Sequence, residues 1–212
     1  MKIIPIGIVL QRNCEAAMTK AEKTRQFIVE KTAPVFNMKG YSGTSLSDMT
    51  EATGLTKGSI YGNFANKDEV ALAVFDYNVK KVHNIISSEM GKHTSAREKL
   101  LTYVHVYENF LKFPFPEGGC PILNTAIEAD DTHPALRKKV TDVLINWKNS
   151  IVKIVQQGID DKEFLPATDP EQIAISIIAL IEGGIMIAKV TGKLSYKVHV
   201  MQSVAMLINA IK

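Results

Sequence analysis

Apolar residues recur at helical spacing along almost the whole chain, and no segment shows the period-two alternation of a half-buried strand. In the segment 20–38 the residues that share one face are Phe27, Ile28, Val35 and Phe36, and Gly40 then supplies a stop signal. The pattern therefore predicts an all-α fold.

Capping and breaking residues divide this pattern into separate helices. Ser45 with Asp48 has the spacing of a capping box, and Asp169 followed by Pro170 is typical of a helix start. Gly54 and Gly192 are placed to end helices. The expected helices span 20–38, 45–53, 56–64, 67–90, 95–113, a segment from 121, 134–158, 170–191 and 195–211.

Composition is that of a globular protein with ample core material. Of 212 residues, 46% are hydrophobic and 22% are charged. The net charge of +3 and pI near 8.7 are compatible with nucleic-acid binding, so the local placement of charge must decide. Cys14 and Cys120 are far apart and lie in no metal-binding spacing, which favours a reducing cytoplasm and predicts neither metal nor cofactor.

The first seventeen residues differ from the rest. Their apolar run, 3–10, is interrupted by Pro5 and Gly7 and is too short to span a membrane. Met18 then opens a segment typical of a natural start, so residues 1–17 are predicted to be a dispensable extension, with a cleaved signal as the alternative. The most apolar stretch, 173–190, contains Ser176, Glu182 and two glycines, and we expect no membrane partner.

One short stretch, GLTKGSIYGNF at 54–64, has a composition that a core helix would not choose. Together with the preceding helix it matches a helix-turn-helix, whose small core would be formed by Leu46, Met49, Ala52, Leu55, Ile60 and Phe64. The residues left outside on the second helix are Lys57, Gly58, Ser59, Tyr61, Gly62 and Asn63. The alternative is that two short helices simply pack, but an interior glycine costs a helix about 1 kcal/mol.

The outer residues suit a DNA surface. Lys57 can contact phosphate or guanine, Gly58 allows close approach of the backbone, and Ser59 and Tyr61 offer hydroxyls to phosphate. Asn63 can read base edges. Three residues flanking this helix could hold neighbouring phosphates: Lys67 at the next helix start, and Thr44 or Ser45 at the first helix N-terminus.

The segment from Lys20 to Phe75 resembles the DNA-binding domain of TetR-type (TetR/AcrR) transcriptional regulators. The resemblance rests on "KGYSGTS", "LTKGSIYGNF" and "NKDEV" in succession. It implies DNA contacts by Thr44, Lys57, Gly58, Ser59, Tyr61, Asn63 and Lys67. Asn63 stands where histidine or tyrosine is common in the family, and Gly62 replaces a larger side chain, so the base preference is open.

The resemblance also implies the domain organisation. Residues 18–66 would form a three-helix DNA-binding domain, and residues 67–212 a helical bundle for effector binding and dimerisation. The partners would be double-stranded DNA carrying a palindromic operator, a small-molecule effector and a second copy of the chain.

The last two helices are apolar around much of their circumference. A stripe wide enough to face both the core and a partner is formed by Ala174, Ile178, Ile181, Ile185, Met201, Ala205 and Ile208. These residues are predicted to form the dimer interface, and the alternative is burial within one chain.

Aromatic residues of the C-terminal part could line an effector pocket. The candidates are Tyr103, Tyr107, Phe110, Phe113, Phe115, Trp147 and Met186. Ordinary core is the favoured alternative for most of them, because aromatic residues at helical spacing do not by themselves identify a cavity. Glu182 lies within an apolar helix and needs a partner, which could be the effector or a group across the dimer.

Cys120 precedes Pro121, so its thiol could lie at a helix N-terminus, where the dipole would lower its pKa. This suggests a second hypothesis, a regulator that senses oxidants or electrophiles, against an inert buried cysteine. A thiol enzyme using Cys120 with His105 or His133 is a further alternative. The acidic run 128–133 gives only a weak metal-site signal and is expected to be a helix end.

The leading interpretation is a dimeric repressor, not an enzyme, that a small molecule releases from DNA. A helical interaction protein without DNA binding is the alternative of another class. It predicts that replacing Lys57 or Tyr61 by alanine changes nothing.

Overall fold

The structure, a computed structural model, describes residues 18–212, and within this range the chain is helical throughout with no strand. The predicted extension 1–17 lies outside the described residues. The elements are α1 (Lys20–Gly43), α2 (Leu46–Thr53), α3 (Lys57–Tyr61), α4 (Lys67–Met90), α5 (Ala96–Glu108), the 3₁₀ turn η1 (Phe110–Lys112), α6 (Pro121–Thr132), α7 (Pro134–Asp160), α8 (Pro170–Thr191) and α9 (Leu194–Ala210). The all-α prediction is confirmed.

The predicted helix ends are found where the capping residues lie. Ser45 and Asp48 form a reciprocal capping box at α2, and Gly54 ends that helix in the left-handed conformation. At α8 the Asp169 side chain accepts hydrogen bonds from the first backbone N–H groups, and Gly192 ends the helix at φ +69°. Local capping chemistry therefore determines these boundaries.

Gly40 breaks the first helix as predicted, with a non-helical φ of +75° and ψ of 178°, and a further helical turn follows the kink to Gly43. Two other elements differ from the expectation. The reading helix α3 has only five residues and ends at Tyr61, because Gly62 and Asn63 already form a turn that brings Phe64 into the core. The expected helix 95–113 is divided into α5 and η1.

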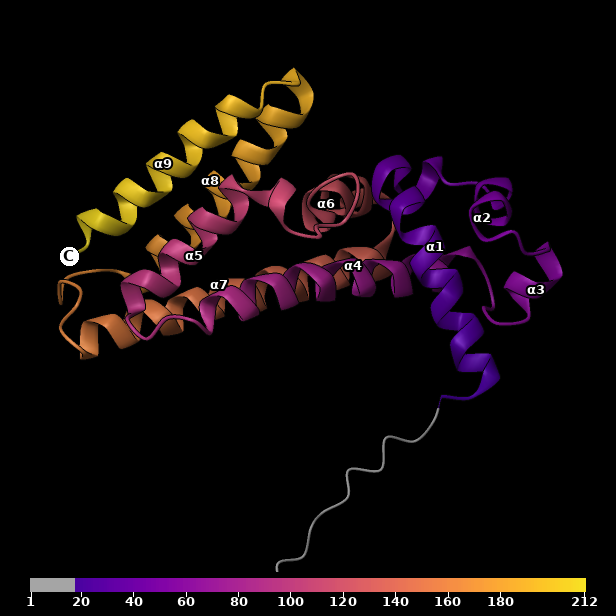
Figure 1. The fold of residues 1–212 in the computed structure, drawn as a ribbon, viewed down its shortest axis with the longest axis horizontal. Coiled ribbons are helices and arrows are strands. Elements are labelled where there is room, and N and C mark those ends of the chain that lie inside the picture. Colours follow the sequence, from indigo (N-terminus) through magenta and orange to yellow (C-terminus); the bar gives the residue numbers. More distant parts are fainter. Residues whose placement is uncertain (1–17) are drawn as a thin grey trace, which may run out of the picture.

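Helices α1 to α3 pack around a small core with the first turns of α4 (Figure 1). The fully buried side chains there include Ile28, Met49, Ile60 and Phe64, and Val70 joins them from α4. The later turns of α4 pack against α5 and α6 instead. This long helix therefore links the helix-turn-helix region, α1 to α3, to the rest of the molecule.

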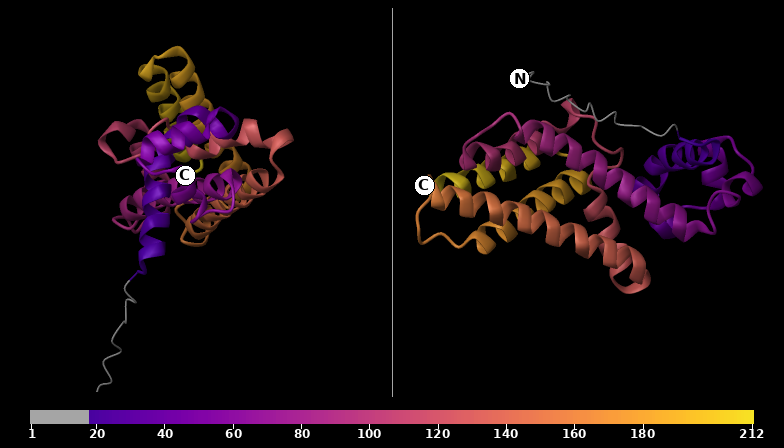
Figure 2. Two further views of the ribbon diagram at one scale, coloured as in Figure 1. Left: turned by 90° about the vertical axis from the view of Figure 1, so that its right-hand side faces the viewer. Right: turned by 90° about the horizontal axis from the view of Figure 1, so that it is seen from below.

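The C-terminal bundle has its own core, formed by α4, α5, α7, α8 and α9. Helices α8 and α9 lie side by side as an antiparallel pair at one side of it (Figure 2). Four residues predicted to face a dimer partner are completely buried inside this core: Ala174, Ile181, Met201 and Ile208. That part of the prediction is wrong, because no surface of these side chains remains for a partner.

Helix α8 is long and apolar enough to cross a membrane by length and composition, with a mean hydropathy of 2.1 over its most apolar window. Within the described residues α8 packs against α7 and α9, and its inner face contributes Ile177 and Ile181 to the core. About a third of this apolar window is buried in the bundle core, and other apolar residues of α8, such as Ile175 and Val190, are exposed.

Candidate DNA-binding surface and effector cavity

Capping residues fix the two ends of the turn in the helix-turn-helix. Gly54 turns the chain after α2, and the Thr56 side chain then accepts the backbone N–H of Ser59 and so starts α3. Ile60 and Phe64, both completely or almost completely buried, fix α3 on the core beneath it. The angle between α2 and α3 is therefore determined by the packing of one short turn.

The residues predicted to contact DNA gather around the exposed side of α3. Lys57 and Gly58 are exposed, and Ser59 and Tyr61 are partly exposed. Asn63 is partly exposed as well, but its side-chain amide donates to the Ser59 carbonyl at 2.9 Å. This hydrogen bond occupies one of the two N–H donors of the amide and leaves the second N–H and the oxygen available for other contacts.

Two of the predicted phosphate-contacting residues near α3 already make contacts within the protein. The Lys67 ammonium lies over the Tyr41 ring, 4.4 Å from its centroid, and is partly buried. The Ser45 hydroxyl is exposed but is already engaged in the α2 capping box with Asp48. A phosphate at either residue would replace or extend a contact that exists within the protein.

Thr44 does not fit its predicted role. Its side chain is completely buried, and its hydroxyl donates to the carbonyl of Gly40 at 2.7 Å. The prediction of a phosphate contact by this side chain is wrong, because the hydroxyl closes the kink at the end of α1 instead.

Arg25 of α1 contacts the turn after α3, which its place in the sequence did not indicate. Its guanidinium lies 3.9 Å from the centroid of the Phe64 ring, donates to the Asn63 carbonyl and pairs with Glu69. It thereby ties α1 to the turn that follows α3. The only sequence signal is an arginine on a mostly polar part of α1, which does not identify its partners.

A cavity of about 290 Å³ lies between α5, the loop 110–120, α8 and α9. This is close to the lower limit for small-molecule sites in proteins. Its lining is formed by Tyr107, Phe110, Phe115, Gly118, Gly119, Cys120, Ile185, Ala188, Lys189, Leu194 and Lys197. The cavity is mostly apolar, and its charged lining residues are both lysines.

Family models match both parts of the chain. One described as bacterial regulatory proteins of the tetR family covers residues 28–74, and one described as a tetracyclin repressor-like C-terminal domain covers residues 96–204, about half of the chain. The chain belongs to the TetR family of bacterial transcriptional regulators.

Solved and sequence relatives agree with this assignment. A TetR-family regulator from Cytophaga hutchinsonii is 51% identical with a TM-score of 0.88, covering 92% of this chain and 98% of the relative. A helix-turn-helix transcriptional regulator of Lactococcus lactis subsp. lactis is 29% identical over 81% of this chain and 86% of its own length. The transcriptional repressor DhaR of Mycobacterium sp. strain GP1 is 25% identical over 78% of this chain and 82% of its own.

Of the predicted effector residues, Tyr107, Phe110 and Cys120 line the cavity of this TetR-family protein. Tyr103 and Trp147 lie behind Tyr107, with the Trp147 ring 6.2 Å from the Tyr107 ring. Met186 does not line it: its side chain is exposed on the outer face of α8. The prediction for Met186 is wrong because neighbouring positions of one helix point in different directions.

Cys120 begins α6, as expected, but its thiol is not activated. The side chain is buried, and burial raises the pKa of the thiol well above its ordinary value, with the Glu182 carboxylate adding to the effect. The thiol donates to Glu182 Oε1 at 3.0 Å. The predicted lowering of its pKa by the helix dipole is therefore wrong, because desolvation outweighs the dipole.

The thiol-enzyme alternative also loses its proposed bases. His105 is exposed beside the Phe113 ring, and the His133 Nδ1 atom accepts the backbone N–H of Leu136 at the start of α7. TetR-family proteins are transcriptional regulators and not enzymes. The acidic run ends α6 as expected, and the described residues contain no cluster suited to a metal ion.

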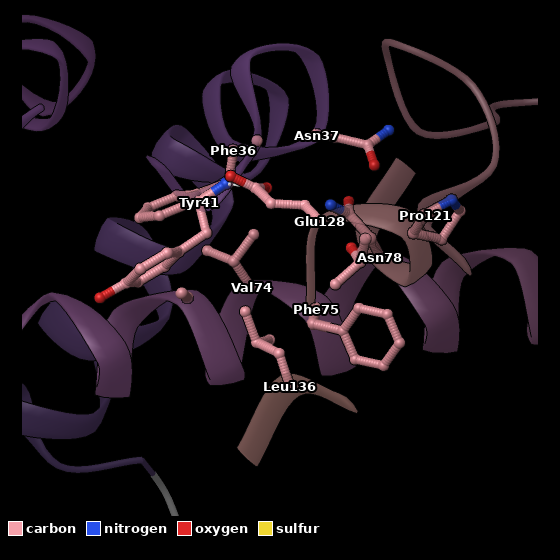
Figure 3. A pocket seen from close by; sticks show the side chains of 12 residues that line it. Phe36, Asn37, Tyr41, Val74, Phe75, Asn78, Pro121, Glu128 and Leu136 are labelled. Atoms are coloured by element: carbon pink, nitrogen blue, oxygen red, sulfur yellow. Dashed lines mark hydrogen bonds between the residues drawn. The ribbon is translucent and has the colours of Figure 1, made fainter. Parts of the chain in front are cut away.

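Helix α6 begins at Cys120 in the cavity wall and runs to the end of α1, where Glu128 lies beside Tyr41 (Figure 3). The Glu128 carboxylate accepts the backbone N–H groups of Tyr41 at 2.7 Å and Ser42 at 2.6 Å, directly after the Gly40 kink. Burial acts to raise the pKa of Glu128, but these hydrogen bonds outweigh it and the pKa lies below its ordinary value. The carboxylate is therefore charged at neutral pH and caps the broken end of α1.

A second set of hydrogen bonds links the cavity wall itself to α1. The Asn37 side-chain amide donates to the carbonyls of Glu117 at 2.6 Å and Gly119 at 3.0 Å. Asn124 donates to the Asn37 and Gly118 carbonyls, and Lys189 of α8 donates to Gly118 and Asn124. The loop that closes the cavity is thus bonded directly to the first helix.

Proposed function

We propose that this TetR-family regulator is a cytoplasmic repressor that binds a palindromic operator as a homodimer and leaves it when a small molecule enters the cavity. The observation that carries the proposal is the hydrogen-bonded loop 117–119, which is shared by the cavity wall and α1. The Mycobacterium relative is named a transcriptional repressor, which supports repression over activation.

In this proposal residues 18–66, together with the first turns of α4, form the DNA-binding domain. Lys57 would contact phosphate or guanine, Gly58 would allow close approach, and Ser59, Tyr61 and the Asn63 oxygen would complete the surface. Because phosphate contacts release counterions, this surface makes binding salt-dependent.

Dimerisation through α8 and α9 is supported by what remains exposed there. Ile175, Ala179, Met186 and Val190 follow one another along the outer side of α8, and Met206 is exposed on α9. Exposed apolar residues in such a run are typical of an interface. The partly buried residues Ile178 and Ala205 of the original prediction stay candidates at its edge.

The coupling between cavity and operator would pass through the loop and through Glu128. A ligand that contacts Gly118 to Cys120 changes the position of the carbonyls that hold Asn37, and α6 carries Glu128 to Tyr41. If the two DNA-binding domains of the dimer shift relative to one another, they no longer match the spacing of two operator half-sites. A coupling free energy of a few kcal/mol between effector and operator binding suffices for release.

A gel-shift series across salt concentrations tests the DNA-binding proposal. The first target is the DNA upstream of the protein's own gene, and random genomic fragments are tested second. We expect saturable binding that weakens with salt, and Lys57→Ala should weaken it and lower the salt slope by about 1. Lys80→Ala, which removes an exposed lysine from α4, is the matched control and should bind like the wild type. Equal binding by both variants, or no selective fragment, would refute the proposal.

Sedimentation equilibrium tests the dimer. Ile175→Asp places a charge in the proposed interface and should yield monomers, whereas Leu111→Asp, at an exposed apolar residue in the turn after α5, should leave the dimer intact. A dimer that survives Ile175→Asp would rule out this face as the interface.

A further inference from the structure

The cavity contains a buried cation without a counter-ion. Lys197 of α9 is only 5% exposed and lines the cavity, with its ammonium 3.7 Å from the centroid of the Phe110 ring. Among the described residues no carboxylate pairs with this ammonium; Glu108 acts on it only from a longer distance. An unpaired buried charge is costly, and the cation–π contact with Phe110 compensates only in part.

The other polar groups of the cavity wall do not supply the missing negative charge. Lys189 is a second cation there, and it is bonded to neutral partners, the Gly118 carbonyl and the Asn124 side chain. Cys120 and Tyr107 stay neutral, because burial raises the pKa of both groups well above their ordinary values. The Glu182 carboxyl group lies behind the Cys120 thiol, bonded to it at 3.0 Å, and burial raises its pKa to about 7, but it is not part of the cavity lining. Lys189 and Lys197 are therefore the charged side chains of the lining.

Burial lowers the pKa of Lys197 to about 8, so this side chain is still largely protonated at neutral pH. A ligand that brings a negative charge to it removes the desolvation cost and gains a charge-assisted hydrogen bond. A neutral ligand would leave the ammonium unpaired and would also remove the water around it.

We propose that the effector is an amphipathic organic anion, a carboxylate or similar acid whose charged group pairs with Lys197 and whose apolar body packs against Phe110, Phe115, Ile185 and Leu194. This inference names the effector class and so rests on the proposed function. The cavity of about 290 Å³ is close to the lower limit for small-molecule sites, which favours a medium-chain or aryl-alkyl acid over a larger ligand.

The test compares acids with their uncharged amides in the intact protein. Octanoate and octanamide have the same length, as do 3-phenylpropionate and its amide, and a series from six to twelve carbons measures how affinity depends on ligand length. Trp147, the only tryptophan of the chain, lies against the cavity residue Tyr107 and reports binding by its fluorescence. Calorimetry then gives the affinity of each pair.

We expect at least one acid to bind about tenfold or more tightly than its amide. Lys197→Met, which keeps the side-chain length and removes the charge, should abolish this preference without weakening the amide. Lys193→Met, an exposed lysine at the start of α9, makes the same change in net charge and should behave like the wild type. No acid preference anywhere in the series, or a preference that survives Lys197→Met, overturns the proposal.

Operator release distinguishes the two proposals. If an acid binds through Lys197 but leaves the DNA complex intact, the effector site is supported and the ligand-release part of the proposed function fails. If the protein binds its operator and only neutral compounds release it, the proposed function is kept and the anion site is refuted.

Discussion

Glu182 lies in an apolar helix with one carboxylate oxygen bonded to the Cys120 thiol and the other, Oε2, without a hydrogen-bond partner among the described residues. Burial raises the pKa of this carboxyl group from 4.5 to about 7, and the hydrogen bond from Cys120 opposes the shift only in part. Replacing Glu182 by glutamine keeps the shape and removes the titration. The variant therefore isolates the free energy of charging this one group.

The sign follows from proton binding. Between pH 4.5 and 7 the folded protein holds a proton on Glu182 that the unfolded chain has released, so the free energy of unfolding falls as the pH rises through this window. With the pKa values of 4.5 and about 7, the loss is about 1 kcal/mol at pH 5 and about 3 kcal/mol at pH 8. Cys120 and Tyr107 do not titrate in this range, since the pKa of each lies well above its ordinary value.

We expect Glu182→Gln to be more stable than the wild type by an amount that grows by about 2 kcal/mol from pH 5 to pH 8. Urea unfolding followed by Trp147 fluorescence at one fixed protein concentration measures it, since a dimer's stability depends on concentration. Glu51→Gln, at an exposed position of α2, is the control and should show no such growth. A stability difference for Glu182→Gln that is constant or shrinks with pH would refute the reasoning.

Three further substitutions test how the parts are held together. Gly40→Ala adds a side chain at φ +75° whose Cβ would lie 2.5 Å from the Glu128 carboxylate, so thermal denaturation should show a loss of about 1–3 kcal/mol, and an unchanged midpoint would contradict the cap. Gly158→Ala places a Cβ 2.3 Å from the Phe164 ring and should cost about 1–3 kcal/mol in urea unfolding, with a neutral result showing that the ring can move. Arg25→Met should cost about 1 kcal/mol and weaken operator binding in gel shifts, because the turn after α3 loses its tie to α1. Undiminished operator affinity would show that this tie is not needed.

The helical elements were predictable because their signals are local. A capping box needs only Ser45 and Asp48 three residues apart, and a left-handed stop needs only Gly54 or Gly192. The reading helix was recognised for the same reason, since its exposed residues are consecutive in sequence. Its length was overestimated, because the turn at Gly62 depends on where Phe64 enters the core.

The faces of the C-terminal helices were not predictable in the same way. Helix α8 is apolar on nearly every side, so its sequence could not tell which residues face the core: Ile181 is completely buried, Ile185 lines the cavity and Met186 is exposed. Periodicity assigns a face only when one side is polar. The predicted dimer stripe therefore included four residues that are buried in the core of the chain itself.

The helix-turn-helix, the capped helix boundaries and the family follow from local sequence patterns, because each depends on residues close together in the chain. Three features depend on the packing of distant helices: Thr44 is buried, Cys120 is bonded to Glu182, and Lys197 lines a cavity without a counter-ion. Solvation and charge at these groups depend on neighbours brought from distant helices. Burial and electrostatics follow from that packing, and no local pattern encodes them.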